Sequence, residues 1–140
     1  MSEYEKIDSY LEKNLDESLG ELSKLVAQPS ISAQGIGLKE CANLVADMLR
    51  ARGFTAEIMD TEGAPVVFAE RKGKGDKTLL FYNHYDVQPP EPLELWESPP
   101  FEPEIRDGKM YGRGISDDKG HITSRLHAID SILKTDGDLP

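Results

Sequence analysis

Two short stretches of the chain carry the residue types that bind metal ions. The first, TLLFYNHYDV at 78–87, places His84 and Asp86 after a run of apolar residues. The second, YGRGISDDKG at 111–120, places Asp117 and Asp118 in a loop bracketed by glycines. A neutral imidazole together with carboxylates suits a divalent ion such as Zn²⁺. The two stretches therefore predict half of a hydrolytic metal site, and no second half is evident in these 140 residues.

His84 and Asp86 are separated by one residue at the end of an apolar run. If the backbone there is a regular strand, the two side chains point to the same face. Asp86 can then accept the N–H of one ring nitrogen while the other nitrogen faces a metal. Taken alone, this pattern also fits a structural pair that binds no metal.

Asp117 and Asp118 have two interpretations. An aspartate at a helix N-cap stabilises the helix by ~1 kcal/mol without any metal. However, Ser116 lies beside them, so the chain offers more capping oxygens than one helix start needs. Two adjacent carboxylates also repel each other unless a cation is near. The surrounding glycines indicate unusual backbone angles or a close backbone approach. The loop is therefore a candidate metal site, with capping as the alternative.

The elements that must position these residues follow an α/β pattern. Apolar residues at steps of three and four predict an amphipathic helix over 4–27. A second helix is expected over 37–52, with Gly53 at its C-cap. Short strands are expected at 54–59 and 65–70, and the apolar stretch 78–83 is expected to be a central strand of a covered sheet.

The second half of the chain begins with a proline-rich stretch. Residues 88–103 contain six of the nine prolines, which excludes a helix or a central strand and predicts an ordered, irregular loop. A hairpin with Asp107-Gly108 as its turn is expected next. A helix over 118–134 should close the chain, with Ile122, Leu126, Ile129 and Leu133 on one face.

Four further features have plain structural interpretations. Cys41 falls on an apolar helix face and is expected to be buried. His127 falls on the polar side of the last helix and is expected to be exposed. Residues 73–78 lack the glycine spacing of a phosphate-binding loop and predict a solvated turn. Trp96 is either a packing anchor for the proline-rich loop or part of a substrate rim.

Composition limits the classes of partner. The net charge of −10 argues against a nucleic-acid partner, because phosphate binding requires a basic surface. A single cysteine excludes an intrachain disulfide and fits a reducing compartment. The N-terminus lacks a secretory signal pattern, and no window is apolar enough to span a membrane. We therefore expect a cytoplasmic protein without a membrane partner.

Several motifs occur in an order that resembles one known family. NHYDV at 83–87 is followed by Trp96, by PPF at 99–101 and by DGKMYGRGISDDKG at 107–120. This order is similar to that of the dinuclear-zinc aminoacylases, acetylornithine deacetylases, glutamate carboxypeptidases and carnosine-type dipeptidases. The Trp, PPF and YGRG wording is most similar to the dipeptidase branch. The helix followed by Gln28-Pro29-Ser30 also resembles the opening of this family.

The resemblance implies a role for each matching residue. His84 would ligate one metal and Asp117 would bridge two. Asp86 would hold the imidazole and count among the catalytic residues, whereas Asp118 would not be a ligand. The family often has a cis peptide bond after the bridging aspartate, so one is expected between Asp117 and Asp118. His121 departs from the small residue that the family has at that position.

The resemblance also implies an activity, which is metal-dependent hydrolysis of a peptide or amide bond by a dipeptidase or other exopeptidase. Its cofactor would be two zinc ions, with manganese or cobalt as alternatives. Its substrate would be a small peptide or an N-acyl amino acid. The remaining ligands and a glutamate general base would lie further downstream. Residues 1–140 are thus expected to be the N-terminal portion of a metallohydrolase catalytic domain with a mixed sheet and flanking helices, homodimeric at full length. The alternatives are an N-acyl amino acid deacylase on the same scaffold, or an incomplete, inactive chain.

Overall fold

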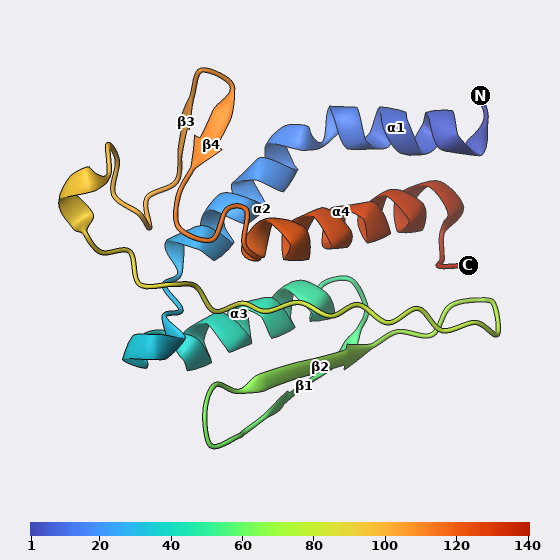
Figure 1. Cartoon of the computed structure of the whole chain (residues 1–140). Coiled ribbons are helices and arrows are strands. Elements are labelled where there is room, and N and C mark those ends of the chain that lie inside the picture. The colour runs from blue at the N-terminus through green and yellow to red at the C-terminus, as the bar shows by residue number, and fades with distance from the viewer.

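The computed structural model describes residues 1–140 as four helices and two small antiparallel sheets (Figure 1). The α/β class expected from the sequence is confirmed. None of the helices combines the length and the apolar character that a membrane crossing requires. In chain order the elements are α1 (Glu3–Lys13), α2 (Leu15–Ala27), the 3₁₀ turn η1 (Ser32–Gln34), α3 (Leu38–Arg50), β1 (Thr55–Met59), β2 (Val66–Glu70), the 3₁₀ turn η2 (Leu93–Leu95), β3 (Glu104–Arg106), β4 (Lys109–Tyr111) and α4 (Lys119–Asp136).

The N-terminal helix is broken, so the expectation of one continuous helix over 4–27 is wrong. Asn14 separates α1 from α2 with a φ of −109° and a ψ of 16°. Its backbone N–H and its side-chain Nδ2 both donate to Tyr10 O, at 3.1 and 2.7 Å. Asparagine competes with the helix in this way because its short side chain bonds to nearby backbone groups. The bend lets both α1 and α2 contact α4.

The middle of the chain matches the sequence expectations closely. Helix α3 packs against β1 and β2, which pair in register from Thr55 opposite Glu70 to Met59 opposite Val66. Gly53 follows the helix with a φ of +79°, a conformation that favours glycine. The core forms where α2, α3 and α4 meet, and its buried residues are Leu25, Cys41, Val45, Met48, Ile122 and Leu126.

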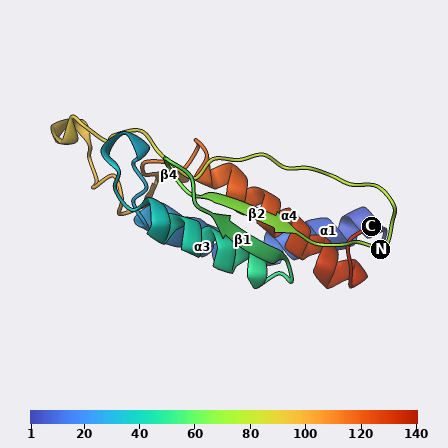
Figure 2. The same cartoon turned by 90° about the horizontal axis from the view of Figure 1, so that it is seen from below.

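The expected central strand at 78–83 does not form. This segment pairs with no other part of the chain, and Figure 2 shows it looping away from the end of β2 and returning as a single extended line. Its apolar side chains are open to solvent, with Leu80 83% and Tyr82 85% exposed. The expectation failed because apolar residues favour a strand only where another strand supplies hydrogen-bond partners, and no segment of this chain does so.

The proline-rich loop and the hairpin after it follow the sequence prediction. Asp107 and Gly108 connect β3 to β4 with φ values of +49° and +72°, as in the tight turns that favour Asp-Gly. Within the loop, the indole Nε1 of Trp96 donates to Pro90 O at 2.8 Å, and the guanidinium of Arg113 lies 5.3 Å from the centre of its ring. These contacts support the role of Trp96 as an anchor for the loop.

Helix α4 contains one residue whose environment the sequence did not predict. His127 was expected to be exposed, but it is buried. Helix α2 covers this side of α4 and brings Glu21 to 2.7 Å from His127 Nε2. The expectation was wrong because the polar face of α4 packs against another charged helix face instead of facing water.

Candidate metal centre

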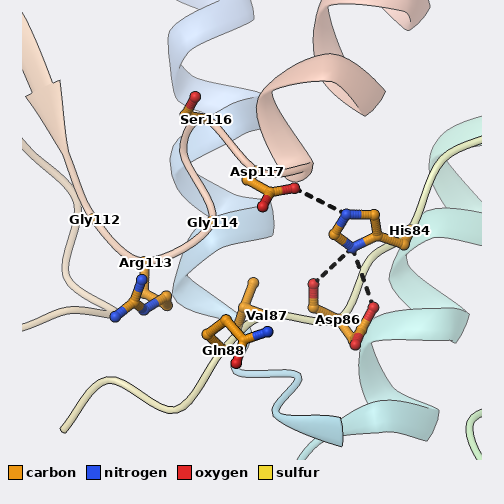
Figure 3. Close-up of a pocket in the computed structure, with 9 residues that line it drawn as sticks. All are labelled: His84, Asp86, Val87, Gln88, Gly112, Arg113, Gly114, Ser116 and Asp117. Atoms are coloured by element: carbon orange, nitrogen blue, oxygen red, sulfur yellow. Dashed lines mark hydrogen bonds and ion pairs between the residues drawn. The ribbon is translucent and has the colours of Figure 1, made fainter.

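His84, Asp86 and Asp117, the three site residues expected from the sequence, lie in one line of contacts (Figure 3). The Nδ1 atom of His84 is 3.1 Å from the carbonyl oxygen of Asp86 and 3.2 Å from its Oδ1. The Nε2 atom on the other side of the ring is 2.9 Å from Asp117 Oδ1. The imidazole therefore lies between two carboxylates that come from segments more than thirty residues apart.

These three residues line a pocket of about 190 Å³. In Figure 3 the three side chains lie on one side of it and Arg113 lies on the other. The side of the pocket that holds His84 is acidic, and the guanidinium of Arg113 is engaged with Pro89 O at 3.3 Å and with the ring of Trp96. The pocket is lined by His84, Asp86, Val87, Gln88, Gly112, Arg113, Gly114, Ser116 and Asp117.

The segment that carries His84 and Asp86 is fastened to the turn after α2. Ser30 O accepts the backbone N–H of Val87 at 2.8 Å, and Ser30 Oγ donates to Tyr85 O at 2.6 Å. Slightly further along the chain, at the start of η1, Ser32 Oγ donates to Asp86 Oδ2 at 2.6 Å. Sequence reasoning missed Ser32, because nothing in its local pattern links it to a residue 54 positions away.

The loop that carries Asp117 requires its glycines. Gly114 has a φ of +93°, and a Cβ atom there would lie 2.7 Å from Val87 Cγ1. A Cβ atom on Gly120 would clash with the backbone oxygen of Ile115. The close approach inferred from the glycine spacing is therefore confirmed, and it brings the loop against the segment that contains His84.

Asp118 uses its carboxylate in a way that the sequence analysis did not predict. It occupies the N-cap of α4 but makes no side-chain capping bond, so capping does not explain this residue. Instead, its Oδ2 accepts from Asn83 Nδ2 at 2.8 Å and from the backbone N–H of His84 at 3.1 Å. Its Oδ1 contacts Nδ1 of His121. The peptide bond between Asp117 and Asp118 is cis, as the resemblance implied.

These hydrogen bonds control the charge of Asp118. Burial alone would raise the pKa of its carboxyl group. The bonds from Asn83, His121 and the backbone of His84 outweigh burial, so the pKa of Asp118 lies below its usual value. The ionised form of Asp118 is therefore favoured, and it contacts the backbone of His84.

Lys119, the next residue, is fully buried and anchors the loop that carries Asp117 to the end of α2. Its ammonium donates to Leu25 O at 3.0 Å and to Gln28 O at 2.6 Å, the carbonyl groups at the C-terminal end of α2. A cation is favourable there because the helix end carries partial negative charge. Burial lowers the pKa of Lys119. Sequence reasoning assigned this lysine no role, since lysine is rarely buried without a partner.

The electrostatics of His84 reflect its acidic surroundings. Partial burial alone would lower the pKa of its ring, but the carbonyl of Asp86 and the carboxylates of Asp117, Asp118 and Asp86 outweigh this effect and raise it. A divalent cation held by His84 and Asp117 would supply a positive partner for these carboxylates.

The donor atoms suit a zinc ion in type. His84 offers an imidazole nitrogen, and Asp117 offers a carboxylate whose side chain is 82% exposed. The chain forms no group of three or more histidine, cysteine, aspartate and glutamate side chains arranged to hold a metal ion. Because zinc takes about four ligands, His84 and Asp117 would supply part of a coordination sphere.

Comparison with known proteins agrees with the resemblance seen in the motifs. The model of the family described as Peptidase family M20/M25/M40 matches residues 80–140. The succinyl-diaminopimelate desuccinylase of Azoarcus sp. (strain BH72) is 38% identical over 110 residues, which cover 79% of this chain. The chain spans 28% of the length of that relative.

Solved structures agree in fold as well as in sequence. The M20 family metallo-carboxypeptidase Sso-CP2 from Sulfolobus solfataricus is 42% identical with a TM-score of 0.82, over 86% of this chain and 28% of that one. Human carnosine dipeptidase 1 is 27% identical with a TM-score of 0.84, over 94% of this chain and 31% of that one. The resemblance to this metallohydrolase family is therefore confirmed in sequence and in fold.

Proposed function

Because this chain resembles Peptidase family M20/M25/M40 in sequence and fold, we propose that it is the N-terminal portion of the catalytic domain of a metal-dependent hydrolase. The reaction is hydrolysis of a peptide or amide bond. One observation carries the proposal, which is the line of contacts from Asp86 through the ring of His84 to Asp117 at the edge of a pocket.

Each residue of that line has one task in the proposed site. Asp86 accepts the N–H on Nδ1 of His84, which leaves Nε2 free to bind a metal. Ser32 holds Asp86 in place by donating a hydrogen bond to Oδ2, the carboxylate oxygen of Asp86 that does not face His84. Asp117, whose side chain is 82% exposed, would bridge the two ions.

Two zinc ions, with manganese or cobalt as alternatives, would activate a water and polarise the scissile carbonyl when bound. The general base and the other ligands belong, in this proposal, to residues outside these 140. The complete protein would be a cytoplasmic homodimer.

Two classes of substrate fit the relatives. Dipeptides and other peptide ends are favoured by the resemblance to a carboxypeptidase and to a dipeptidase. N-acyl amino acids are favoured by the relatives named as desuccinylases, which release an acyl group from an amine. Peptides and N-acyl amino acids are both hydrolysed at an amide bond, so the proposed site of Asp86, His84 and Asp117 serves either substrate.

Zinc titration of the 140-residue chain tests the site. Isothermal calorimetry of the wild type should show weak binding, because the chain offers few ligands. His84→Ala should abolish that binding, whereas His121→Ala should retain it, because His121 does not line the pocket. Equal affinity in wild type and His84→Ala would refute the proposed ligand.

A substrate panel tests the activity. Zinc-loaded chain should release no product from dipeptides or from N-acyl amino acids, because the proposed general base is absent. The same panel applied to a chimera, in which this chain replaces the matching 28% of Sso-CP2, should restore hydrolysis. Robust turnover by the 140 residues alone would show that the chain does not need the further residues that the proposal invokes.

A further inference from the structure

One carboxylate outside the expected ligand set connects the two stretches that carry the candidate site. Asp118 is buried at the start of α4, with 8% of its surface exposed. Through Oδ2 it accepts hydrogen bonds from Asn83 and from the backbone N–H of His84. Asp117 and Asp118 therefore hold the same histidine at two points, Asp117 at the ring and Asp118 at the backbone.

The segment that contains His84 has little else to fix it on this side. Residues 78–83 pair with no strand, and Leu80 and Tyr82 are largely exposed. A backbone without ladder bonds is free to move unless side chains fix it. The position of the His84 backbone therefore depends on contacts made by the start of α4.

A residue about two turns further along, within α4 itself, reinforces the contact. Arg125 Nη1 donates to Asn83 Oδ1 at 2.5 Å and to Tyr82 O at 3.0 Å. Asn83 is thus held at both ends of its amide, by Asp118 at the nitrogen and by Arg125 at the oxygen. Since Asp118 directly precedes α4 and Arg125 lies within it, these contacts tie residues 82–84 to the segment that carries Asp117.

We propose that Asp118 is a positioning residue, which sets the location of His84 relative to Asp117 through the two hydrogen bonds accepted by its Oδ2 atom. The proposal rests on the function proposed above, in which His84 and Asp117 bind metal. A carboxylate is suited to this task because a charged acceptor makes stronger hydrogen bonds than a neutral one. The other oxygen of Asp118, Oδ1, contacts the exposed ring of His121 and has no part in the proposed positioning of His84.

This division of the carboxylate makes the proposal testable with three variants. Asp118→Ala removes both oxygens. Asp118→Asn keeps one oxygen, which can still accept from Asn83 and His84 while the new amide faces His121, whose ring accepts in its other tautomer. His121→Ala removes only the partner of Oδ1 and is the matched control.

The main readout is the imidazole of His84 in nitrogen-15 NMR of the 140-residue chain. The chain has three histidines, so the ring signals are few and can be assigned by substitution. Asp118→Ala should shift the His84 ring signals, Asp118→Asn should recover most of the wild-type pattern, and His121→Ala should leave the His84 signals in place. Zinc affinity should fall by roughly 10- to 100-fold in Asp118→Ala.

Unchanged His84 signals in a folded Asp118→Ala chain would overturn the proposal, even if its unfolding temperature fell, because loss of stability alone does not move this ring. Equal shifts in Asp118→Asn and Asp118→Ala would also overturn it. If Asp118→Ala does not fold, Asn83→Ala decides, since it removes one of the two donors and should give a smaller shift in the same direction. No shift in that variant would count against the proposal.

The outcome for Asp118 is separable from the outcome for the proposed function. If the wild type binds no zinc, the metal site fails, but the NMR signals of His84 still report on its position. If the wild type binds zinc and Asp118→Ala binds it equally well, the metal site stands and the positioning role fails.

Discussion

At the candidate metal centre, His84 faces Asp86 and Asp117 across an open pocket, whereas between the helices His127 faces Glu21 and Asp130 around the guanidinium of Arg52. We call the second group, formed by Glu21, Arg52, His127 and Asp130, the helix-junction cluster. Both groups contain a histidine with carboxylates on two sides. They differ in what neutralises the carboxylates.

The helix-junction cluster contains its own cation. Arg52 makes paired hydrogen bonds with Glu21, at 3.0 and 2.7 Å, and with Asp130, at 2.9 and 2.7 Å. Only 9% of its side chain is exposed. It links α2, α4 and the end of α3, so the charges are satisfied inside the protein.

The candidate metal centre has no such cation on the side that holds His84. Its carboxylates contact His84, Ser32, Asn83 and His121, and the one arginine that lines the pocket is engaged with Pro89 and Trp96. An arrangement of this kind has electrostatic room for a divalent ion, whereas the helix-junction cluster has none. The comparison therefore separates a histidine cluster that already contains its counter-charge from one that has room for a metal ion.

The largest expected effect comes from removing the internal cation. Arg52→Ala leaves the partly buried carboxylates of Glu21 and Asp130 without their guanidinium partner, so the free energy of unfolding should fall by about 3–5 kcal/mol. Urea denaturation followed by circular dichroism measures this change. Arg50→Ala is the control, because Arg50 is half-exposed and pairs with Asp47 on the surface; its loss should cost about 1 kcal/mol or less. Similar losses of stability in the two variants would show that Arg52 contributes no more than a surface arginine does.

A smaller effect is expected from acid. Burial alone would raise the pKa of Glu21, but hydrogen bonds and charge from Arg52 and His127 outweigh it and lower the pKa. A carboxyl with a lowered folded-state pKa contributes stability that is complete above its unfolded pKa and is lost as pH falls through the folded value. Wild type should therefore lose stability below about pH 5 more steeply than Glu21→Gln. Urea denaturation across this pH range measures the slope, with Glu12→Gln on the exposed face of α1 as the control.

The smallest effect on stability is expected at the candidate metal centre. Asp117 has a side chain that is 82% exposed and contacts only His84. Asp117→Ala should change the free energy of unfolding by about 0.5 kcal/mol or less, while it weakens zinc binding. Urea denaturation and calorimetry of the same sample compare the two. A large loss of stability would mean that this carboxylate is structural, as the carboxylates of the helix-junction cluster are.

Much of the fold was predictable because it depends on local patterns. Helix α3, the strands β1 and β2, the Asp107-Gly108 turn and α4 formed where periodicity, turn residues and caps predicted them. The break at Asn14 was not predicted, because the regular apolar stripe on both sides of it indicates a continuous helix. The break depends on a single side chain, Asn14, which bonds to Tyr10 O. The extended, unpaired conformation of residues 78–83 was not predicted. A strand forms only with a partner strand, and the local sequence of a segment does not show whether the chain supplies one.

The residue types and spacing of the candidate site were also visible in the sequence. His84, Asp86 and Asp117 lie together as the motifs implied. The supporting contacts were not visible, since Ser32, Asn83 and Lys119 act across separations of 35 to 94 residues. Such partners leave no local periodicity.

The sequence alone thus determined the helices, the turns and the chemical types of the site residues, because these depend on neighbours in the chain. Only the tertiary structure decided which histidine is closed off by an arginine and which is open beside a pocket. His84 and His127 both lie within three residues of an aspartate in the sequence. Their difference arises from α2 and Arg52, which cover one and not the other, and this packing is decided by contacts between distant segments.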